Sequence, residues 1–180
     1  MAQISNFDAV EWHWKIAGED EALYLVLTAD IEFRTRFGLA SLLGFSVDGQ
    51  TFSTQDACIY SEYREQFKSL PLNEEGRFSL AINATVARLY IKPLANKSWY
   101  FSPTYEANVR TLGRGDYVSA QALSQGLYLV LDTDESTSTI MLLSSGHRID
   151  ENRHFLRGKT LRVHNDRLSL ELYQIQEQQL

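Results

Sequence analysis

The stretch of residues 73–101 limits the possible folds of this chain more than any other. Asn73 can cap a helix, because its side-chain oxygen can accept a hydrogen bond from an unpaired N–H of the first turn. Glu74, directly after it, places a carboxylate near the positive end of the helix dipole. Pro93 cannot continue a helix, and it disfavours the helical conformation at the residue before it. The sequence therefore predicts a helix over residues 73–92.

This predicted helix is apolar on two sides. One stripe at helical spacing consists of Phe78, Ile82, Val86 and Leu89, and the other consists of Leu80, Ala81, Ala84, Ala87 and Ile91. A surface helix needs only one such stripe, since its other side meets water. We therefore expect this helix to be central, with another element packed against each side.

The residues before this helix predict a sheet and a first helix. Strand patterns cover residues 10–15, 22–28 and 31–37, and helical spacing covers residues 55–70. Residues 39–43 fit either an extension of the third strand or a short helical turn. The predicted fold class is therefore α+β, with an N-terminal mixed α/β domain over residues 1–95 in which an antiparallel sheet packs with two helices.

After Pro93 the sequence changes to short strand-like runs separated by turn residues. The runs are residues 99–105, 117–122, 127–132, 137–143, 159–164 and 168–173. Even spacing with no helical pattern between the runs is typical of a small antiparallel sheet closed into a barrel or sandwich. We expect an antiparallel β-barrel-like C-terminal domain over residues 96–180.

Composition narrows the possible partners. The chain has 180 residues, a formal net charge of −6 and a sequence pI of about 5.2. Because phosphate binding needs a basic footprint, nucleic acid is not expected as the main partner. The N-terminus lacks a basic start followed by an apolar run, and nowhere do about 18 apolar residues run together. Neither a signal peptide nor membrane insertion is predicted, and the expected location is the cytoplasm.

Motifs that carry chemistry are weak. The single cysteine, Cys58, excludes a disulfide within the chain, and we expect it to be a small core residue on a helix. The four histidines have no cysteine or carboxylate at ligand spacing, and no phosphate-binding glycine loop precedes a helix. Ser144 and Ser145 lie near His147 and Asp150, but closeness in sequence does not give the geometry of a catalytic triad. We therefore predict no metal, no cofactor and no enzymatic activity.

Basic and aromatic side chains are better candidates for a binding site. Alternation puts two arginines on the outer face of the third strand, and further cations gather with an indole where the central helix ends. The residues are Arg34, Arg36, Arg88, Lys92, Lys97 and Trp99. Cations beside aromatic rings suit an acidic peptide that carries an apolar anchor. The alternative is that Lys92 only complements the negative end of the helix and that Trp99 is a core residue.

A second set of cations lies in the C-terminal half. It consists of Arg148, Arg153, Arg157, Lys159, Arg162 and Arg167. We treat this segment, residues 148–167, as a candidate second binding surface.

Several motifs together resemble a known family. They are Trp12-x-Trp14, Phe33-Arg34-Thr35-Arg36-Phe37, Asp56-Ala57, Leu80-x-x-Asn83-Ala84, Ala87-Arg88-x-Tyr90-x-Lys92-Pro93, Lys97-Ser98-Trp99 and Asn165-Asp166-Arg167-Leu168. In order and spacing they resemble ZapC, a family of cell-division proteins of gammaproteobacteria. The resemblance runs from residue 12 to residue 168 and is densest between residues 80 and 99.

The resemblance implies a cytosolic, non-enzymatic protein of the division ring. Such a protein binds polymers of the tubulin-like GTPase FtsZ, promotes lateral association of its protofilaments and stabilises the ring. FtsZ-binding proteins meet either the globular GTPase domain or a short acidic C-terminal tail with apolar anchors. Leu25 matches a pocket position of the family and is expected to receive an apolar anchor. A chain that links filaments needs two binding surfaces or must dimerise, so we expect a monomer or a weak homodimer.

Two other classes of function stay open at this point. One is a binding module for a different partner, a nucleic acid or an anionic surface, held by segment 148–167. The other is an enzyme that uses His147 or His154, which requires a pocket where the imidazole meets a carboxylate and a nucleophile. The acidic net charge argues against the first class, and the missing motifs argue against the second.

Overall fold

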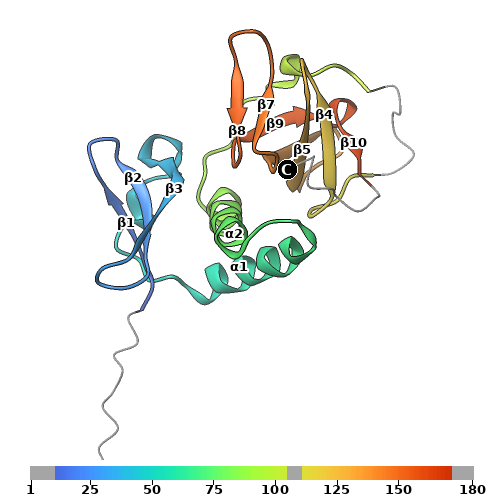
Figure 1. The fold of residues 1–180 in the computed structure, drawn as a ribbon. Coiled ribbons are helices and arrows are strands. Elements are labelled where there is room, and N and C mark those ends of the chain that lie inside the picture. Colours follow the sequence, from blue (N-terminus) through green and yellow to red (C-terminus); the bar gives the residue numbers. More distant parts are fainter. Residues whose placement is uncertain (1–10, 105–110, 172–180) are drawn as a thin grey trace, which may run out of the picture.

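The computed structural model describes residues 11–104 and 111–171. Its described part holds two α-helices and ten β-strands (Figure 1). The N-terminal elements are β1 (His13–Ala17), β2 (Ala22–Val26), β3 (Glu32–Gly38), α1 (Thr54–Gln66) and α2 (Glu74–Leu89). The C-terminal strands are β4 (Tyr117–Gln121), β5 (Gln125–Thr133), β6 (Thr137–Leu142), β7 (Gly146–Arg148), β8 (His154–Leu156), β9 (Thr160–His164) and β10 (Ser169–Leu170). The predicted α+β class is confirmed.

Helix α2 is the central helix that the sequence predicts. The Asn73 side chain accepts a hydrogen bond from the N–H of Gly76 at 2.8 Å, which caps the first turn. Residues 80–87 are all buried, and the helix contacts both β3 and β5. Figure 1 shows α2 between the small sheet of β1–β3 and the C-terminal strands. The helix therefore packs against two different sheets, as its two apolar stripes predict.

The end of α2 is set by pairing with another segment. The last helical residue is Leu89, whereas the sequence predicts a helix up to residue 92. Beyond Leu89, the C=O of Tyr90 accepts a hydrogen bond from the N–H of Leu43 at 2.8 Å, and the N–H of Lys92 donates to the C=O of Ser41 at 2.9 Å. These bonds pair residues 90–92 with the segment 41–43 and leave them outside the helix. Pro93 therefore only sets the last residue that the helix could have reached.

The first sheet is antiparallel, in the order β1-β2-β3. Along β3 the side chains of Thr35 and Phe37 are buried, while those of Arg34 and Arg36 are exposed, as the alternation predicts. The segment after β3 forms a 3₁₀ turn over Leu39–Ser41, which decides between its two predicted conformations. The outer face of β3 therefore presents two cations.

The second sheet is antiparallel, in the order β10-β4-β5-β6-β9, and the β7-β8 hairpin stands beside it (Figure 1). Among the described residues this sheet is not closed into a barrel, so the expected barrel-like closure is corrected to an open sheet. Strand β10 spans only two residues, and the outer edge of β9 is met by Asn96, which bridges to Arg162. Residues 172–173 of the last predicted run lie outside the described residues.

One local prediction for the C-terminal half is wrong, and one hairpin was not predicted. The predicted strand at residues 99–105 is instead a 3₁₀ turn over Ser98–Tyr100, and residue 105 lies outside the described residues. The N–H of Tyr100 donates to the C=O of Lys97 at 3.1 Å, a local bond that a strand does not make. The β7-β8 hairpin was not predicted, because each of its strands has only three residues.

Strand β5 contributes to two hydrophobic clusters. Leu127, Leu129 and Leu131 pack in the cluster that holds α2 and the first sheet, whereas Tyr128 and Val130 pack in a cluster of the C-terminal half. Because successive side chains of a strand point to opposite faces, β5 acts as a wall between the two clusters. The domain boundary between residues 95 and 96 stays a prediction.

Cys58 is exposed on α1, so its expected role in the core is wrong. The buried side chains of α1 are Asp56, Ile59 and Tyr63, which recur at helical spacing and leave Cys58 on another face. Asp56 is buried because it completes a capping box and accepts a hydrogen bond from the Tyr90 hydroxyl at 2.6 Å. A polar residue therefore occupies part of the buried face of α1, and Cys58 lies on a different face.

Replacing Leu129 with alanine tests the wall formed by β5. Removing most of a fully buried side chain leaves a cavity against α2, and we expect the free energy of unfolding to fall by about 2–5 kcal/mol. Urea transitions followed by tryptophan fluorescence and by far-UV circular dichroism should still coincide. The exposed Leu123→Ala is the matched control and should change the stability by less than about 0.5 kcal/mol. Two separate transitions would contradict the shared packing.

Candidate functional site

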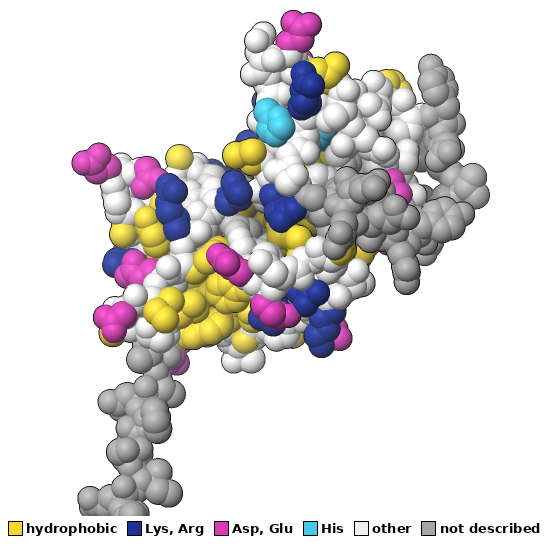
Figure 2. Space-filling model, viewed as in Figure 1, with side chains coloured by type: hydrophobic (Ala, Val, Ile, Leu, Met, Phe, Trp, Pro, Cys, Tyr) yellow, Lys and Arg dark blue, Asp and Glu magenta, His cyan; other side chains and the backbone are white. Residues whose placement is uncertain are grey.

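A groove opens between the N-terminal and C-terminal halves. It lies among the end of β3, the segment after α2 and the turn between β8 and β9, and its cavity measures about 430 Å³. Its apolar lining consists of Phe37, Ile91, Leu94, Phe155 and Leu156. Arg36, Lys159 and His154 supply its basic groups. Figure 2 shows Lys and Arg side chains across the middle of this face, with hydrophobic side chains beside them.

Arg36 crosses from β3 to the β8-β9 turn. Gly158 in this turn has a φ of +85°, a conformation that favours glycine, and a Cβ added there would lie 2.5 Å from the Cδ atom of Arg36. The arginine side chain therefore lies directly on the glycine backbone. Any larger residue at position 158 would force the Arg36 side chain to shift.

The cations of the groove lack acidic partners. Among residues 11–104 and 111–171, neither Arg36 nor Lys159 forms an ion pair with a carboxylate. The Lys159 ammonium lies 5.8 Å from the ring centre of Phe155. Burial, and then the nearby charge of Arg36, lowers the pKa of the Arg157 guanidinium. Like charges crowd this groove, so an anion placed there would be attracted.

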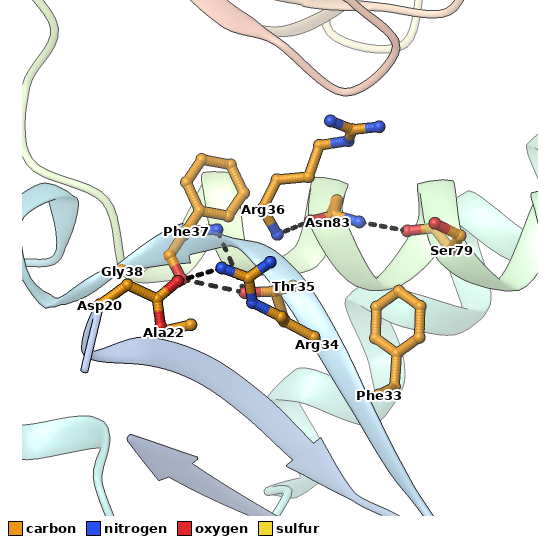
Figure 3. A pocket seen from close by; sticks show the side chains of 10 residues that line it. All are labelled: Asp20, Ala22, Phe33, Arg34, Thr35, Arg36, Phe37, Gly38, Ser79 and Asn83. Carbon is orange, nitrogen blue, oxygen red and sulfur yellow. Dashed lines mark hydrogen bonds and ion pairs between the residues drawn. The ribbon is translucent and has the colours of Figure 1, made fainter. Parts of the chain in front are cut away.

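A second hollow lies beside β3, on the other side of Arg36. Its cavity measures about 520 Å³, and its polar lining includes Asp20, Arg34, Ser79 and Asn83 (Figure 3). Arg34 forms an ion pair with Asp20, so its charge is already matched. Arg36 lines both the groove and this hollow. The two concavities are therefore neighbours that share one side chain.

The other predicted binding residues at the end of α2 fall into three situations. Arg88 pairs with Glu62 at 2.9 Å and its side chain is only 21% exposed, so it is already neutralised. Lys92 donates a hydrogen bond to the C=O of Ala40 at 3.0 Å. The Lys97 ammonium lies 4.8 Å from the ring centre of Trp99, which is 68% exposed and therefore not a core residue. Lys92 lies between two groove-lining positions of the same segment.

Leu25 is fully buried in the core beneath the first sheet and lines neither concavity. Its expected role in receiving an apolar anchor stays a prediction, since no open surface reaches its side chain in this structure. Its position on β2 pairs with Phe33, which does line the hollow beside β3.

Segment 148–167 does not form one basic face. Three of its cations are paired with carboxylates: Arg153 with Asp150 at 3.8 Å, Arg162 with Asp134 at 2.5 Å, and Arg167 with Asp166 at 3.1 Å. Lys159 belongs to the groove, with Arg157 beside it in sequence, and Arg148 lies on β7. The predicted second surface is therefore split between different parts of the C-terminal half.

The apolar lining of the groove was missed in the sequence. Ile91 and Leu94 flank a proline, whereas Phe155 and Leu156 lie more than sixty residues later. The available signal was Gly158, a glycine between two cations, which indicates a tight turn that holds charges close together.

Comparison with known proteins decides the family. The family model described as "Cell-division protein ZapC, N-terminal" matches residues 8–92, and the one described as "Cell-division protein ZapC, C-terminal" matches residues 93–174. The cell division protein ZapC of Proteus mirabilis is 31% identical over 162 residues, which cover 88% of this chain and 86% of that protein. The chain belongs to the ZapC family. The resemblance expected from its motifs is confirmed.

Further relatives agree with this assignment. The ZapC proteins of Shewanella woodyi and Vibrio cholerae are 28% and 26% identical over 160 and 162 residues, and each alignment covers 88% of this chain. The alignments cover 87% and 88% of those two relatives. ZapC is a family of cell-division proteins and not a known enzyme family, so a role in cell division is supported.

Of the two histidine candidates in this ZapC-family chain, His154 lines the groove and His147 is part of the core. His147 is fully buried, with its Nδ1 atom 2.6 Å from the Tyr128 hydroxyl and its Nε2 atom 2.9 Å from the C=O of Ser124. A backbone C=O only accepts, so Nε2 carries the proton and Nδ1 accepts from the tyrosine. The Ser144 hydroxyl accepts a hydrogen bond from the N–H of Leu127 at 2.9 Å. These contacts do not build the nucleophile and base of a triad.

Among the described residues, no helix is both long and apolar enough to cross a membrane. In the same residues, no three His, Cys, Asp or Glu side chains gather as they would around a metal ion.

Acid should destabilise the fold through His147. Burial lowers the pKa of its imidazole below the unfolded value of about 6.5, so the unfolded chain binds one more proton at low pH. We expect the free energy of unfolding to fall as the pH drops below about 6.5, by up to about 1.4 kcal/mol per pH unit. Urea unfolding between pH 7.5 and 5 measures this slope.

Two variants separate His147 from other groups that titrate in this range. The His147→Gln variant should be less stable but should lose this part of the slope, whereas the exposed His164→Gln should keep it. An unchanged slope in His147→Gln would assign the acid sensitivity to another group.

Proposed function

We propose that this chain binds FtsZ directly, promotes lateral bundling of FtsZ protofilaments and stabilises the Z-ring at the division site. It would do so in the cytoplasm and without catalysis. The cell-division role of the family supports the process, and the basic groove supports a direct contact with an acidic partner.

The observation that carries this proposal is the pairing of unmatched cations with open apolar surface in one groove. Leu156 is 56% exposed beside Phe155, so an apolar side chain of a partner could displace water there. Arg36 and Lys159 would meet carboxylates on either side of that anchor. Both features match an acidic FtsZ segment with an apolar residue in it, such as the acidic C-terminal tail.

Bundling adds a requirement that single-site binding does not meet. Each ion pair in the groove contributes on the order of 0.2–1 kcal/mol, so affinity for a filament would come from the buried anchor and from many copies along the polymer. Linking two filaments further needs a second FtsZ contact or a weak homodimer. Sedimentation equilibrium of the free chain distinguishes these two routes.

Charge reversal in the groove should abolish most of the binding. For the double variant Arg36→Glu, Lys159→Glu we expect FtsZ polymer formed with GTP to pellet the chain with an affinity at least about tenfold lower, a loss of about 1.4 kcal/mol. Thermal stability should stay within a few degrees, because neither cation has an acidic partner in the described residues.

The matched control changes the net charge by the same amount elsewhere. Lys15 and Lys68 are exposed and line neither concavity, so Lys15→Glu, Lys68→Glu should pellet nearly as wild type does. Equal loss in both double variants would mean that only the overall charge matters. A wild-type chain that stays in the supernatant with FtsZ polymer would overturn the proposed function itself.

Reversing Lys92 and Lys97 tests the two lysines that follow α2. Neither lysine forms an ion pair with a carboxylate in the described part of the chain, so the double glutamate variant should fold. We expect it to lose co-sedimentation with FtsZ polymer while the melting temperature changes little. Unchanged co-sedimentation would remove these two lysines from the binding surface.

A further inference from the structure

Strand β3 contains a bulge at the point where it reaches the groove. Its regular pairing with β2 ends at Tyr24↔Arg34 and resumes at Ala22↔Gly38. Between these pairs, β3 has the three residues 35–37 and β2 has one, so two residues of β3 are in excess. A bulge of this kind leaves strand groups without ladder partners and re-aims a side chain.

The unpaired group is captured by a helix side chain. The N–H of Arg36 donates to the Oδ1 atom of Asn83 on α2 at 2.8 Å, and the Nδ2 atom of Asn83 donates to the C=O of Ser79 at 2.8 Å (Figure 3). Asn83 is only 2% exposed, within the buried part of α2. A buried carboxamide is unfavourable unless both of its ends are bonded, and here both are.

Apolar packing does not explain an asparagine at this position. Its neighbours Ile82 and Ala84 are completely buried, and asparagine is a poorer helix former than leucine or alanine. The Asn83 carboxamide supplies one hydrogen-bond acceptor at the bulge, and its own bond to the preceding turn of α2 holds it in place. The side chain of Arg36 then runs over Gly158 into the groove.

We propose that Asn83 is a positioning residue for the groove: by binding the N–H of Arg36, it fixes the β3 bulge that carries the Arg36 guanidinium across to Gly158. This inference rests on the proposed binding of FtsZ through Arg36. Asn83 lies below the surface and touches no partner in this scheme. Its contribution is to preorganise the cation, so that less freedom is lost on binding.

A double-mutant cycle tests this dependence. The affinity for FtsZ polymer is measured for wild type, Asn83→Ala, Arg36→Ala and the double variant. We expect each single change to weaken binding about fivefold, and Asn83→Ala to add almost nothing once Arg36 is alanine. The loss of thermal stability caused by Asn83→Ala should be similar in both backgrounds, because the backbone N–H of residue 36 is present in both. Equal weakening in both backgrounds would overturn the positioning role.

The matched control is Thr85→Ala on the same helix. Thr85 is also fully buried and donates its hydroxyl proton to the C=O of Ala81 at 2.8 Å, so this hydrogen bond stays within α2. This variant should lose stability and keep its affinity for FtsZ. If it weakens binding as Asn83→Ala does, the effect is general softening of α2 and the proposal fails.

A second readout does not depend on FtsZ. Amide hydrogen exchange followed by NMR should show protection at Arg36 in wild type and in Thr85→Ala, and its loss in Asn83→Ala. Protection of the Arg36 amide that persists in Asn83→Ala would overturn the claim that Asn83 fixes the bulge, and this result does not depend on which partner the chain binds. Loss of protection together with no FtsZ binding by wild type would instead place the failure in the proposed function.

Discussion

The position of α2 between the two sheets is the constraint on which the rest of the structure depends. The small sheet has only three strands, so it could not bury enough apolar surface without another element packed on it. The leucines on one face of β5 also need an apolar partner, and α2 supplies it. Burying one such leucine contributes about 1.5–3 kcal/mol, more than an exposed ion pair at about 0.2–1 kcal/mol. The groove has one wall on β3 and the other on the β8-β9 turn, so the packing of α2 sets the distance between its cations.

Periodicity predicted the elements that tertiary contacts leave undisturbed. The alternation at Arg34 and Arg36, the cap at Asn73 and the two-sided burial of α2 all follow from local patterns. Sequence reasoning failed where a distant segment decides the backbone. The N–H of Lys92 bonds to Ser41, which ends the helix early, and local hydrogen bonds make residues 98–100 a turn although their aromatic composition favours a strand.

For the site, the sequence identified the cations but not their neighbours. Arg36 and Lys159 were both candidates, yet they belonged to different predicted surfaces, because no local pattern shows that β3 faces the β8-β9 turn. Arg88 and Arg162 were candidates too, and the fold gives each a carboxylate, Glu62 and Asp134. A charge becomes a candidate ligand for a partner only when the chain itself leaves it unmatched, and that depends on long-range packing.

The chain has 23 acidic residues against 17 Lys and Arg, so carboxylates are not scarce, yet none forms an ion pair with Arg36 or Lys159 among the described residues. Elsewhere, exposed arginines such as Arg34 and Arg114 do find acidic partners. The contrast between the acidic surface and the unpaired cations of the groove would orient the approach of a charged partner. An acidic polymer is repelled by most of an acidic surface and attracted at this groove, so the field would select one docking face before any contact forms. For the proposed linking of filaments, a fixed docking face matters as much as affinity, because it determines which surface is left to meet the second filament.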